Sequence, residues 1–218
     1  MADRSDASSW TVPPLPARGD RADVPGAMHG SRLLDQPEHR EARDRIAELC
    51  SGSDPLAIEI GFDHGMRLLD HARRWPEIRW LGLELRRRRV DAVALHAPPN
   101  CAVVRADART VFATLVPDGR VSWVYALFPT PVRRGARLLF TPSFVADLRR
   151  ALTSDGQVAV ATDVPAMAAW IEAQLHGWPV GVGVPLGPVL SRRERVCLRD
   201  GTPVHRIERR VPAAPVLG

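Results

Sequence analysis

The sequence predicts an α/β fold in which a mostly parallel central sheet is covered by helices on both faces. Short apolar runs alternate strictly with amphipathic stretches over most of the chain, which is the pattern of parallel sheets built from crossover units. The first apolar run, within Leu56–Gly65, leads into a glycine-bearing turn and then a helix-like segment. Open α/β sheets build nucleotide pockets from this strand, turn and helix arrangement.

Five apolar runs are interpreted as the strands of this sheet. Each has the length of a strand and is bounded by turn residues or prolines. The predicted strands are Leu56–Ile60, Arg79–Glu84, Cys101–Arg105, Val121–Phe128 and Gln157–Ala161.

Helices are predicted before the first strand and after each of the five strands. Several begin or end next to a proline, which is a common helix boundary. The predicted helices are Glu38–Leu49, Met66–Arg74, Arg87–His96, Arg109–Leu115, Pro142–Leu152 and Pro165–His176.

The C-terminal part changes character. Val180–Val189 is rich in glycine and proline, and the segments Arg192–Leu198 and Pro203–Arg210 predict an antiparallel strand pair. Residues 1–40 are proline-rich and lack periodicity, so we expect a disordered arm there. Residues 41–212 then form the single domain, and residues 213–218 a tail.

Composition bounds the class of protein. The formal net charge is +5, and all 30 basic residues are arginine, because the chain has no lysine. This usage fits either genomic codon bias or a polyanionic partner. No segment predicts a membrane span or a signal peptide, so a cytoplasmic location is expected. Cys50, Cys101 and Cys197 match no metal-ligand spacing and are expected to be buried free thiols, with no metal bound.

Acidic residues stand at or just beyond the ends of the first three predicted strands. They are Glu59, Glu84 and Asp107. Ligands of open α/β sheets bind at these strand ends, and a carboxylate about 20 residues after the glycine turn is suited to hold a ribose diol. Asp107 suits an adenine amino group. The alternative is that such residues cap the helices that follow, as Asp107 is well placed to do.

The glycine turn argues against a dinucleotide site. Gly61-Phe62-Asp63-His64-Gly65 does not match G-x-G-x-x-G, and the Asp63 carboxylate would repel a pyrophosphate. A nucleoside-bearing cofactor without a pyrophosphate, such as S-adenosylmethionine, fits better. His64 is ambiguous between a surface residue and a ligand.

Several motifs occur in one order along the chain and resemble those of the bacterial tRNA (guanine-N7)-methyltransferase family. The resemblance covers about Asp54–Leu175 and, more weakly, the C-terminal segment. The motifs are Ile58-Glu59-Ile60-Gly61-Phe62, Leu81-Gly82-Leu83-Glu84, Asp107-Ala108, Phe128-Pro129-x-Pro131, Ala161-Thr162-Asp163 and Ser191-Arg192-Arg193-Glu194.

This resemblance implies a Rossmann-like class I methyltransferase fold, S-adenosylmethionine as cofactor and tRNA as partner. The implied cofactor-binding residues are Glu59, Gly61, Gly65, Glu84, Asp107 and Ala108. The implied substrate-side residues are Arg134, Asp163, Ser191 and Glu194, with Asp163 and Thr130 as the catalytic pair.

The sequence departs from the family in two places. Thr130 and Val132 stand where the family has an aspartate and a tryptophan, and the arginine loop that follows is short. Asp63 replaces a glycine of the cofactor turn. These departures leave two alternatives open: a diverged N-methyltransferase of a small nitrogen heterocycle, and a non-catalytic RNA- or partner-binding relative. Four consecutive arginines, Arg86–Arg89, favour a solvated helix face over an RNA contact.

Overall fold

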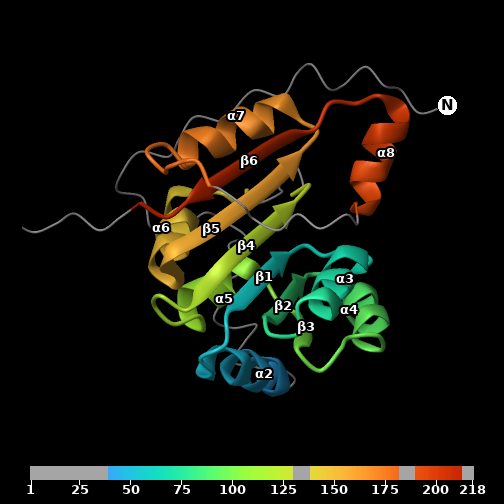
Figure 1. The fold of residues 1–218 in the computed structure, drawn as a ribbon, viewed down its shortest axis with the longest axis vertical. Coiled ribbons are helices and arrows are strands. Elements are labelled where there is room, and N and C mark those ends of the chain that lie inside the picture. Colours follow the sequence, from blue (N-terminus) through green and yellow to red (C-terminus); the bar gives the residue numbers. More distant parts are fainter. Residues whose placement is uncertain (1–38, 130–137, 182–189, 213–218) are drawn as a thin grey trace, which may run out of the picture.

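A six-stranded sheet runs through the computed structural model, which describes residues 39–129, 138–181 and 190–212 (Figure 1). Its order is β3-β2-β1-β4-β5-β6. All neighbouring pairs are parallel except β5 and β6, which are antiparallel. The strands are β1 (Leu56–Ile60), β2 (Arg79–Glu84), β3 (Cys101–Arg105), β4 (Val121–Leu127), β5 (Leu152–Thr162) and β6 (His205–Arg210). The predicted fold class, a mostly parallel sheet with an antiparallel C-terminal pair, is confirmed.

Helices cover both faces of this sheet. One buried cluster packs α2, α5, α6 and α7 against it, and a second packs α3 and α4 against the other face. The helices are α2 (Arg40–Ser51), α3 (Met66–Arg74), α4 (Arg87–Ala94), α5 (Ala108–Thr114), α6 (Pro142–Ala151), α7 (Pro165–Gln174) and α8 (Arg192–Asp200). No helix of these described parts is both long and apolar enough to span a membrane.

The order of the strands determines where a ligand can bind. The chain winds outward from β1 through β2 to β3, and then crosses back to place β4 on the other side of β1. The turn after β1 therefore lies at the topological switch point, where open α/β sheets bind their ligands. The carboxyl ends of β1, β2 and β3 are adjacent along this edge.

Strand alternation sends the side chains of β1 to opposite faces. Ile58 belongs to the cluster under α2, α5, α6 and α7, whereas Ala57 belongs to the cluster under α3 and α4. Because successive side chains of a strand alternate, Glu59 faces the α3 side together with Ala57. Its neighbour in the register on β4 is Tyr125, which is also in the α3–α4 cluster.

At the C-terminal side of the sheet, one secondary-structure prediction was wrong and one predicted strand was too short. Arg192–Leu198 is not a strand: it lies in α8, whose first turn is held by a capping box, and β6 pairs with β5 instead. The strand predicted at Gln157–Ala161 is also longer, because β5 begins at Leu152. The capping box starts a helix at Ser191, and the pairing of Val121 with Leu152 extends β5 toward its amino end.

The three cysteines, Cys50, Cys101 and Cys197, are free and buried, as predicted.

Candidate functional site

The turn after β1 forms the centre of the candidate site. Three of its five residues have positive φ: Gly61 at 73°, Asp63 at 50° and Gly65 at 68°. The Gly61 N–H donates to the Leu83 carbonyl at 2.7 Å, and this bond ties the turn to the end of β2. A Cβ at Gly61 would have no heavy atom within 4 Å. The backbone of this turn is therefore open on one side to a closely approaching ligand.

Glu59 is buried beneath this turn, with 3% of its surface exposed. Its Oε2 has no hydrogen-bond partner among the described residues. Arg67 of α3, itself 4% exposed, lies on the same face, with its guanidinium 4.8 Å from the ring centroid of Tyr125. Burial raises the pKa of Glu59 to about 7, although the positive charge of Arg67 opposes this shift. An orphaned carboxylate oxygen at a strand end indicates a group held ready for a ligand or a water.

Glu84 ends β2 with a fixed carboxylate. Its Oε1 accepts hydrogen bonds from the backbone N–H groups of Leu85 at 2.9 Å and Arg86 at 3.0 Å. These bonds hold the carboxylate in one orientation at the sheet edge, and only 9% of the residue is exposed. The second oxygen, Oε2, has no partner among the described residues and is the one available for a ligand hydroxyl.

Asp107 caps the helix that follows it, which confirms the alternative interpretation of this residue. Its side chain accepts from the backbone N–H of Arg109 at 3.0 Å and is the N-cap of α5. The Arg109 guanidinium binds the same carboxylate through both oxygens. Ala108, buried, is the first residue of α5. A cofactor role for Asp107 and Ala108 stays a prediction, and Asp107 would have to share its carboxylate with the cap.

Asp163 lies beyond the end of β5, on the other side of the switch point. Its Oδ2 accepts from the Arg193 Nε at 3.0 Å and also from Nη2 of the same guanidinium. Its Oδ1 has no partner within the described residues. The side chain of Asp163 is 12% exposed and that of Arg193 is 54% exposed, so the Arg193 end of the pair faces solvent.

Ser191 and Glu194 form the capping box of α8. The Ser191 Oγ accepts from the Glu194 N–H at 3.1 Å, and Glu194 Oε2 accepts from the Ser191 N–H at 3.2 Å. The other carboxylate oxygen of Glu194, Oε1, pairs with Arg206 of β6. Both oxygens of Glu194 are thus occupied within the protein. The sequence motif assigned to the substrate has a structural role in this helix.

Replacing Ser191 with alanine is expected to lower the free energy of unfolding by about 1 kcal/mol, because one N-terminal N–H of α8 loses its acceptor. Urea denaturation of the full chain measures this change. Ser53→Ala, at an exposed serine outside any helix, is the matched control. Equal stability of the two variants would show that the cap contributes nothing.

The turn after β1 and the helix α8 contact each other directly. The Asp63 carboxylate pairs with Arg89 at 3.3 Å and Arg86 at 3.9 Å, so the residue that replaces a family glycine is directed toward α4. Arg192 Nη1 of α8 lies 3.1 Å from Nε2 of His64. His64, which the sequence left ambiguous, therefore joins the turn to α8.

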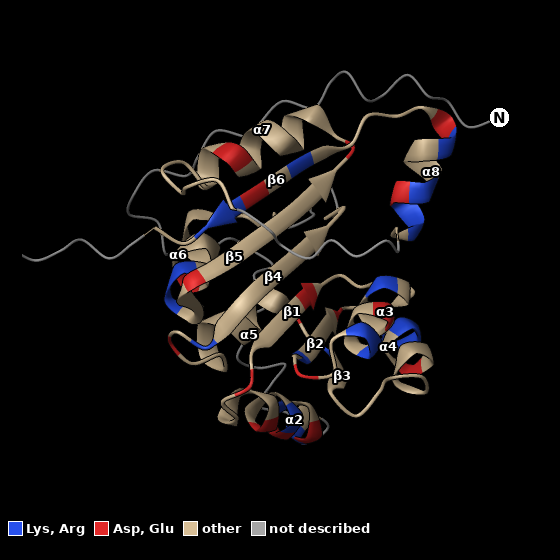
Figure 2. Ribbon diagram, in the orientation of Figure 1, with Lys and Arg blue, Asp and Glu red and all other residues tan. Residues whose placement is uncertain are grey.

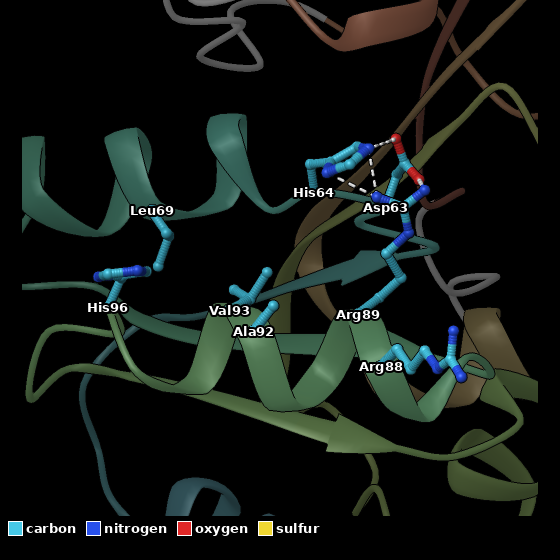
Figure 3. A pocket seen from close by; sticks show the side chains of 8 residues that line it. All are labelled: Asp63, His64, Leu69, Arg88, Arg89, Ala92, Val93 and His96. Carbon is cyan, nitrogen blue, oxygen red and sulfur yellow. Dashed lines mark hydrogen bonds and ion pairs between the residues drawn. The ribbon is translucent and has the colours of Figure 1, made fainter.

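A cavity of about 540 Å³ lies beside this turn, between α3 and α4 (Figure 3). Asp63, His64 and Arg89 meet at one end of it, and His96 lies at the other. Its complete lining is Asp63, His64, Leu69, Arg88, Arg89, Ala92, Val93 and His96. It contains none of the acidic residues predicted at the strand ends, so it is a neighbour of the candidate site and not the site itself.

The loop after β4 begins with a strained residue. Phe128 has φ 52°, and its N–H donates to the Ala161 carbonyl at 2.6 Å. Non-glycine residues with positive φ are uncommon and are concentrated at functional sites. Thr130 and Arg134, which the sequence assigns to catalysis and substrate binding, lie outside the described residues.

The structure thus separates the predicted residues into two groups. Those assigned to the cofactor are grouped at the ends of β1, β2 and β3, while Asp163, Ser191 and Glu194 lie on the β5–α8 side. Sequence reasoning missed the arginines that pair with these acids, which are Arg193 and Arg206. The abundance of arginine was the only signal, and it did not specify partners.

Comparisons with known proteins identify relatives over most of the chain. A family model described as "Putative methyltransferase" matches residues 53–180. A tRNA (guanine-N(7)-)-methyltransferase of Leifsonia xyli is 36% identical over 164 residues, which cover 72% of this chain and 70% of the relative. One of Myxococcus xanthus is 31% identical over 179 residues, covering 74% and 85%. For a relative from Saccharophagus degradans, the aligned part spans 56% of each protein.

Solved structures share the fold at much lower identity. The 16S rRNA methyltransferase KamB superposes with a TM-score of 0.54 at 16% identity, covering 81% of this chain and 94% of KamB. An antibiotic-related methyltransferase superposes with a TM-score of 0.51 at 13% identity, covering 78% and 94%. These likenesses concern the fold alone.

Proposed function

The chain belongs to the tRNA (guanine-N7)-methyltransferase family, and we propose that it transfers a methyl group from S-adenosylmethionine to N7 of a guanine in tRNA. The observation that carries this proposal is the division of acidic residues about the switch point. Glu59 and Glu84 end adjacent strands on one side, and Asp163 lies on the other. A cofactor and a base bound on these two sides would meet at the open turn after β1.

The residues present fit S-adenosylmethionine. The cofactor supplies an electrophilic methyl group on a sulfonium ion. Glu84, held by two backbone N–H groups, would accept hydrogen bonds from a ribose diol through Oε2. The orphaned oxygen of Glu59 would face the positively charged amino-acid end, and Gly61 would allow its close approach. Asp63 does not obstruct this fit, because ion pairs direct it toward α4.

On the substrate side, Asp163 is better placed than Glu194 to hold a guanine. The donor edge of guanine carries N1–H and an exocyclic amine, which suit a carboxylate. Asp163 keeps Oδ1 available beside its Arg193 pair, whereas both oxygens of Glu194 are used by the capping box and Arg206. We therefore assign the base contact to Asp163, and to Glu194 the task of fixing α8 beside it.

The reaction requires no general base. N7 of guanine carries a lone pair and no proton, so the protein has only to align the nucleophile, the methyl carbon and the sulfur. Such positioning contributes about 7–11 kcal/mol to lowering a barrier. The Asp163 carboxylate would also stabilise the positive charge that develops on the methylated base.

Methyl transfer from labelled S-adenosylmethionine to an unmodified tRNA transcript tests the proposal. We expect incorporation into the transcript, identified as 7-methylguanosine by mass spectrometry of the nucleosides. A transcript made with 7-deazaguanosine has carbon in place of N7 and serves as the control, which should stay unlabelled. Absence of transfer, together with absence of cofactor binding by calorimetry, would refute the proposal.

The same assay separates the alternatives. Turnover of free guanosine or another small heterocycle without turnover of tRNA would assign a small-molecule substrate. Binding of tRNA without binding of the cofactor would identify a non-catalytic RNA-binding relative. For a tRNA-modifying enzyme, the expected location is the cytoplasm.

A further inference from the structure

Positive charge is concentrated on two segments of the chain. Residues 86–94, which are α4 and its N-cap, and residues 191–200, which are α8 and its N-cap, together hold eight arginines and three acidic residues. Their excess of five positive charges equals the formal net charge of the whole protein. The formal charges of the remaining residues therefore sum to zero.

The fold brings these two segments together beside the turn after β1. Arg192 of α8 contacts His64 in the turn, and Arg195 Nη2 lies 3.0 Å from the sulfur of Met66, the first residue of α3. Arg86 follows Glu84, the last residue of β2, by two positions. Figure 2 shows basic segments on α8 and on the neighbouring α3 and α4. We call Arg86–Arg89 together with the arginines of α8 the arginine surface.

Part of this surface is already neutralised by ion pairs. Asp63 engages Arg86 and Arg89, and Asp163 engages Arg193. The remaining pairs are Arg87 with Asp91 and Arg199 with Asp200. Three exposed arginines make no ion pair with a carboxylate within the described residues, and they are Arg88, Arg192 and Arg195.

We propose that the arginine surface of α4 and α8 binds the phosphodiester backbone of the tRNA whose guanine is methylated. This inference rests on the proposed function and adds the surface by which the substrate is held. Guanidinium groups donate paired N–H bonds that match phosphate oxygens, and the surface borders the turn where the reaction would occur. Its two segments contain no aromatic residue on which a base could stack, so it binds phosphates rather than reading bases.

The structure changes the interpretation of the arginine run on α4. A solvated helix face is normally balanced by acidic residues three or four positions away, but the segment 86–94 contains only Asp91. The neighbouring helix α8 contributes further arginines instead of the missing acids. Two like-charged helices that contact the same turn favour a polyanion that spans both of them.

The test removes the three unpaired charges together, in the variant Arg88→Gln/Arg192→Gln/Arg195→Gln. Affinity for an unmodified tRNA transcript is measured by fluorescence anisotropy over a series of salt concentrations. The control is Arg40→Gln/Arg45→Gln/Arg149→Gln, which removes the same charge from exposed positions on α2 and α6. Both helices lie toward the amino ends of the strands (Figure 1). Thermal unfolding of both variants checks that each one still folds.

Each phosphate contact changes the slope of log affinity against log salt by about 0.7–0.9, so at ~0.1 M salt one contact corresponds to roughly a five- to eightfold change. We expect the test variant to lose affinity on the order of 100-fold and about 2–3 units of slope, and the control to lose much less. Equal losses in the two variants would overturn the proposal, because they would reflect net charge alone.

Three further outcomes also decide between the possibilities. Unchanged tRNA binding with lost binding to phosphatidylserine vesicles would assign the surface to a lipid and overturn the proposal. Failure of this inference is distinguishable from failure of the proposed function. If the wild type methylates tRNA but the test variant binds it normally, only the surface is wrong. If the test variant loses tRNA affinity but the wild type transfers no methyl group, the surface stands and the activity is wrong.

Discussion

Replacing Glu84 with alanine is expected to lower the affinity for S-adenosylmethionine at least about 100-fold. In the proposed complex the Glu84 carboxylate accepts two ribose hydroxyls, and hydrogen bonds to a charged group each contribute roughly 1.5–3 kcal/mol. A loss of about 3 kcal/mol corresponds to a little more than 100-fold in the dissociation constant. Isothermal titration calorimetry of the wild type and the variant with the cofactor measures this difference.

The geometry of β2 makes Glu84→Gln an informative second variant. An amide oxygen can still accept from the N–H groups of Leu85 and Arg86, so the end of the strand stays in place. Without the negative charge, the grip on the diol weakens, and we expect a loss between those of the wild type and Glu84→Ala. Glu77→Ala, at an exposed glutamate just before the same strand, is the matched control. Equal affinities for Glu84→Ala and Glu77→Ala would show that the ribose lies elsewhere.

Much of the sheet could be predicted because its information is local. Leu56–Ile60 and Cys101–Arg105 have the bounds expected from sequence, since short buried strands are continuous apolar runs between turn residues. The acidic residues at their ends could be placed at one edge because parallel strands finish together. The observed strand order confirms this proximity, because β1, β2 and β3 are neighbours in the sheet.

The wrong strand prediction at Arg192–Leu198 arose where one motif supports two interpretations. Ser191 and Glu194 resemble a substrate motif, but the same spacing is a helix capping box, and that signal correctly marks the start of α8. The ion pairs Asp163–Arg193 and Glu194–Arg206 could not be predicted, because their members lie 30 and 12 residues apart. They depend on how α8 and β6 pack beside the end of β5.

The paired state of these acids has a consequence for the candidate site. A carboxylate already bound by a guanidinium keeps its negative charge and its orientation, so a guanine can be received with little rearrangement. Asp163 retains one oxygen for this purpose, whereas Glu194 does not. Sequence resemblance treats these residues as equivalent contacts, and the geometry distinguishes them.

Glu59→Gln is expected to stabilise the protein at pH 8 while weakening cofactor binding. Burial raises the pKa of the Glu59 carboxyl to about 7 from an ordinary value of 4.5. Between these two values the native state holds a proton that the unfolded state has released. The free energy of unfolding contributed by Glu59 therefore falls as the pH rises from about 4.5 to 7, and is constant above pH 7.

At ~1.4 kcal/mol per unit of pKa, ionisation of the buried Glu59 carboxyl lowers the free energy of unfolding by about 3 kcal/mol at pH 8. A glutamine side chain does not ionise, so its contribution to stability does not change with pH. The stability difference between Glu59→Gln and the wild type should therefore grow by about 3 kcal/mol between pH 4.5 and pH 8. Urea denaturation at a series of pH values measures it, and taking the difference between the proteins cancels the titration of other groups. Glu77→Gln, at an exposed glutamate that makes no ion pair within the described residues, is the control for the loss of one carboxylate.

The combination of effects identifies the role of the buried carboxylate. If Glu59 only filled space, its amide would stabilise the protein at pH 8 without changing the affinity for the cofactor. A gain of stability with a loss of cofactor affinity would instead show that the protein retains a costly buried acid because the ligand requires it. Arg67 lies on the same face, and its positive charge opposes the rise in the Glu59 pKa. It therefore reduces the loss of stability that the buried carboxylate causes. A stability difference that stays flat across this pH range would contradict the argument.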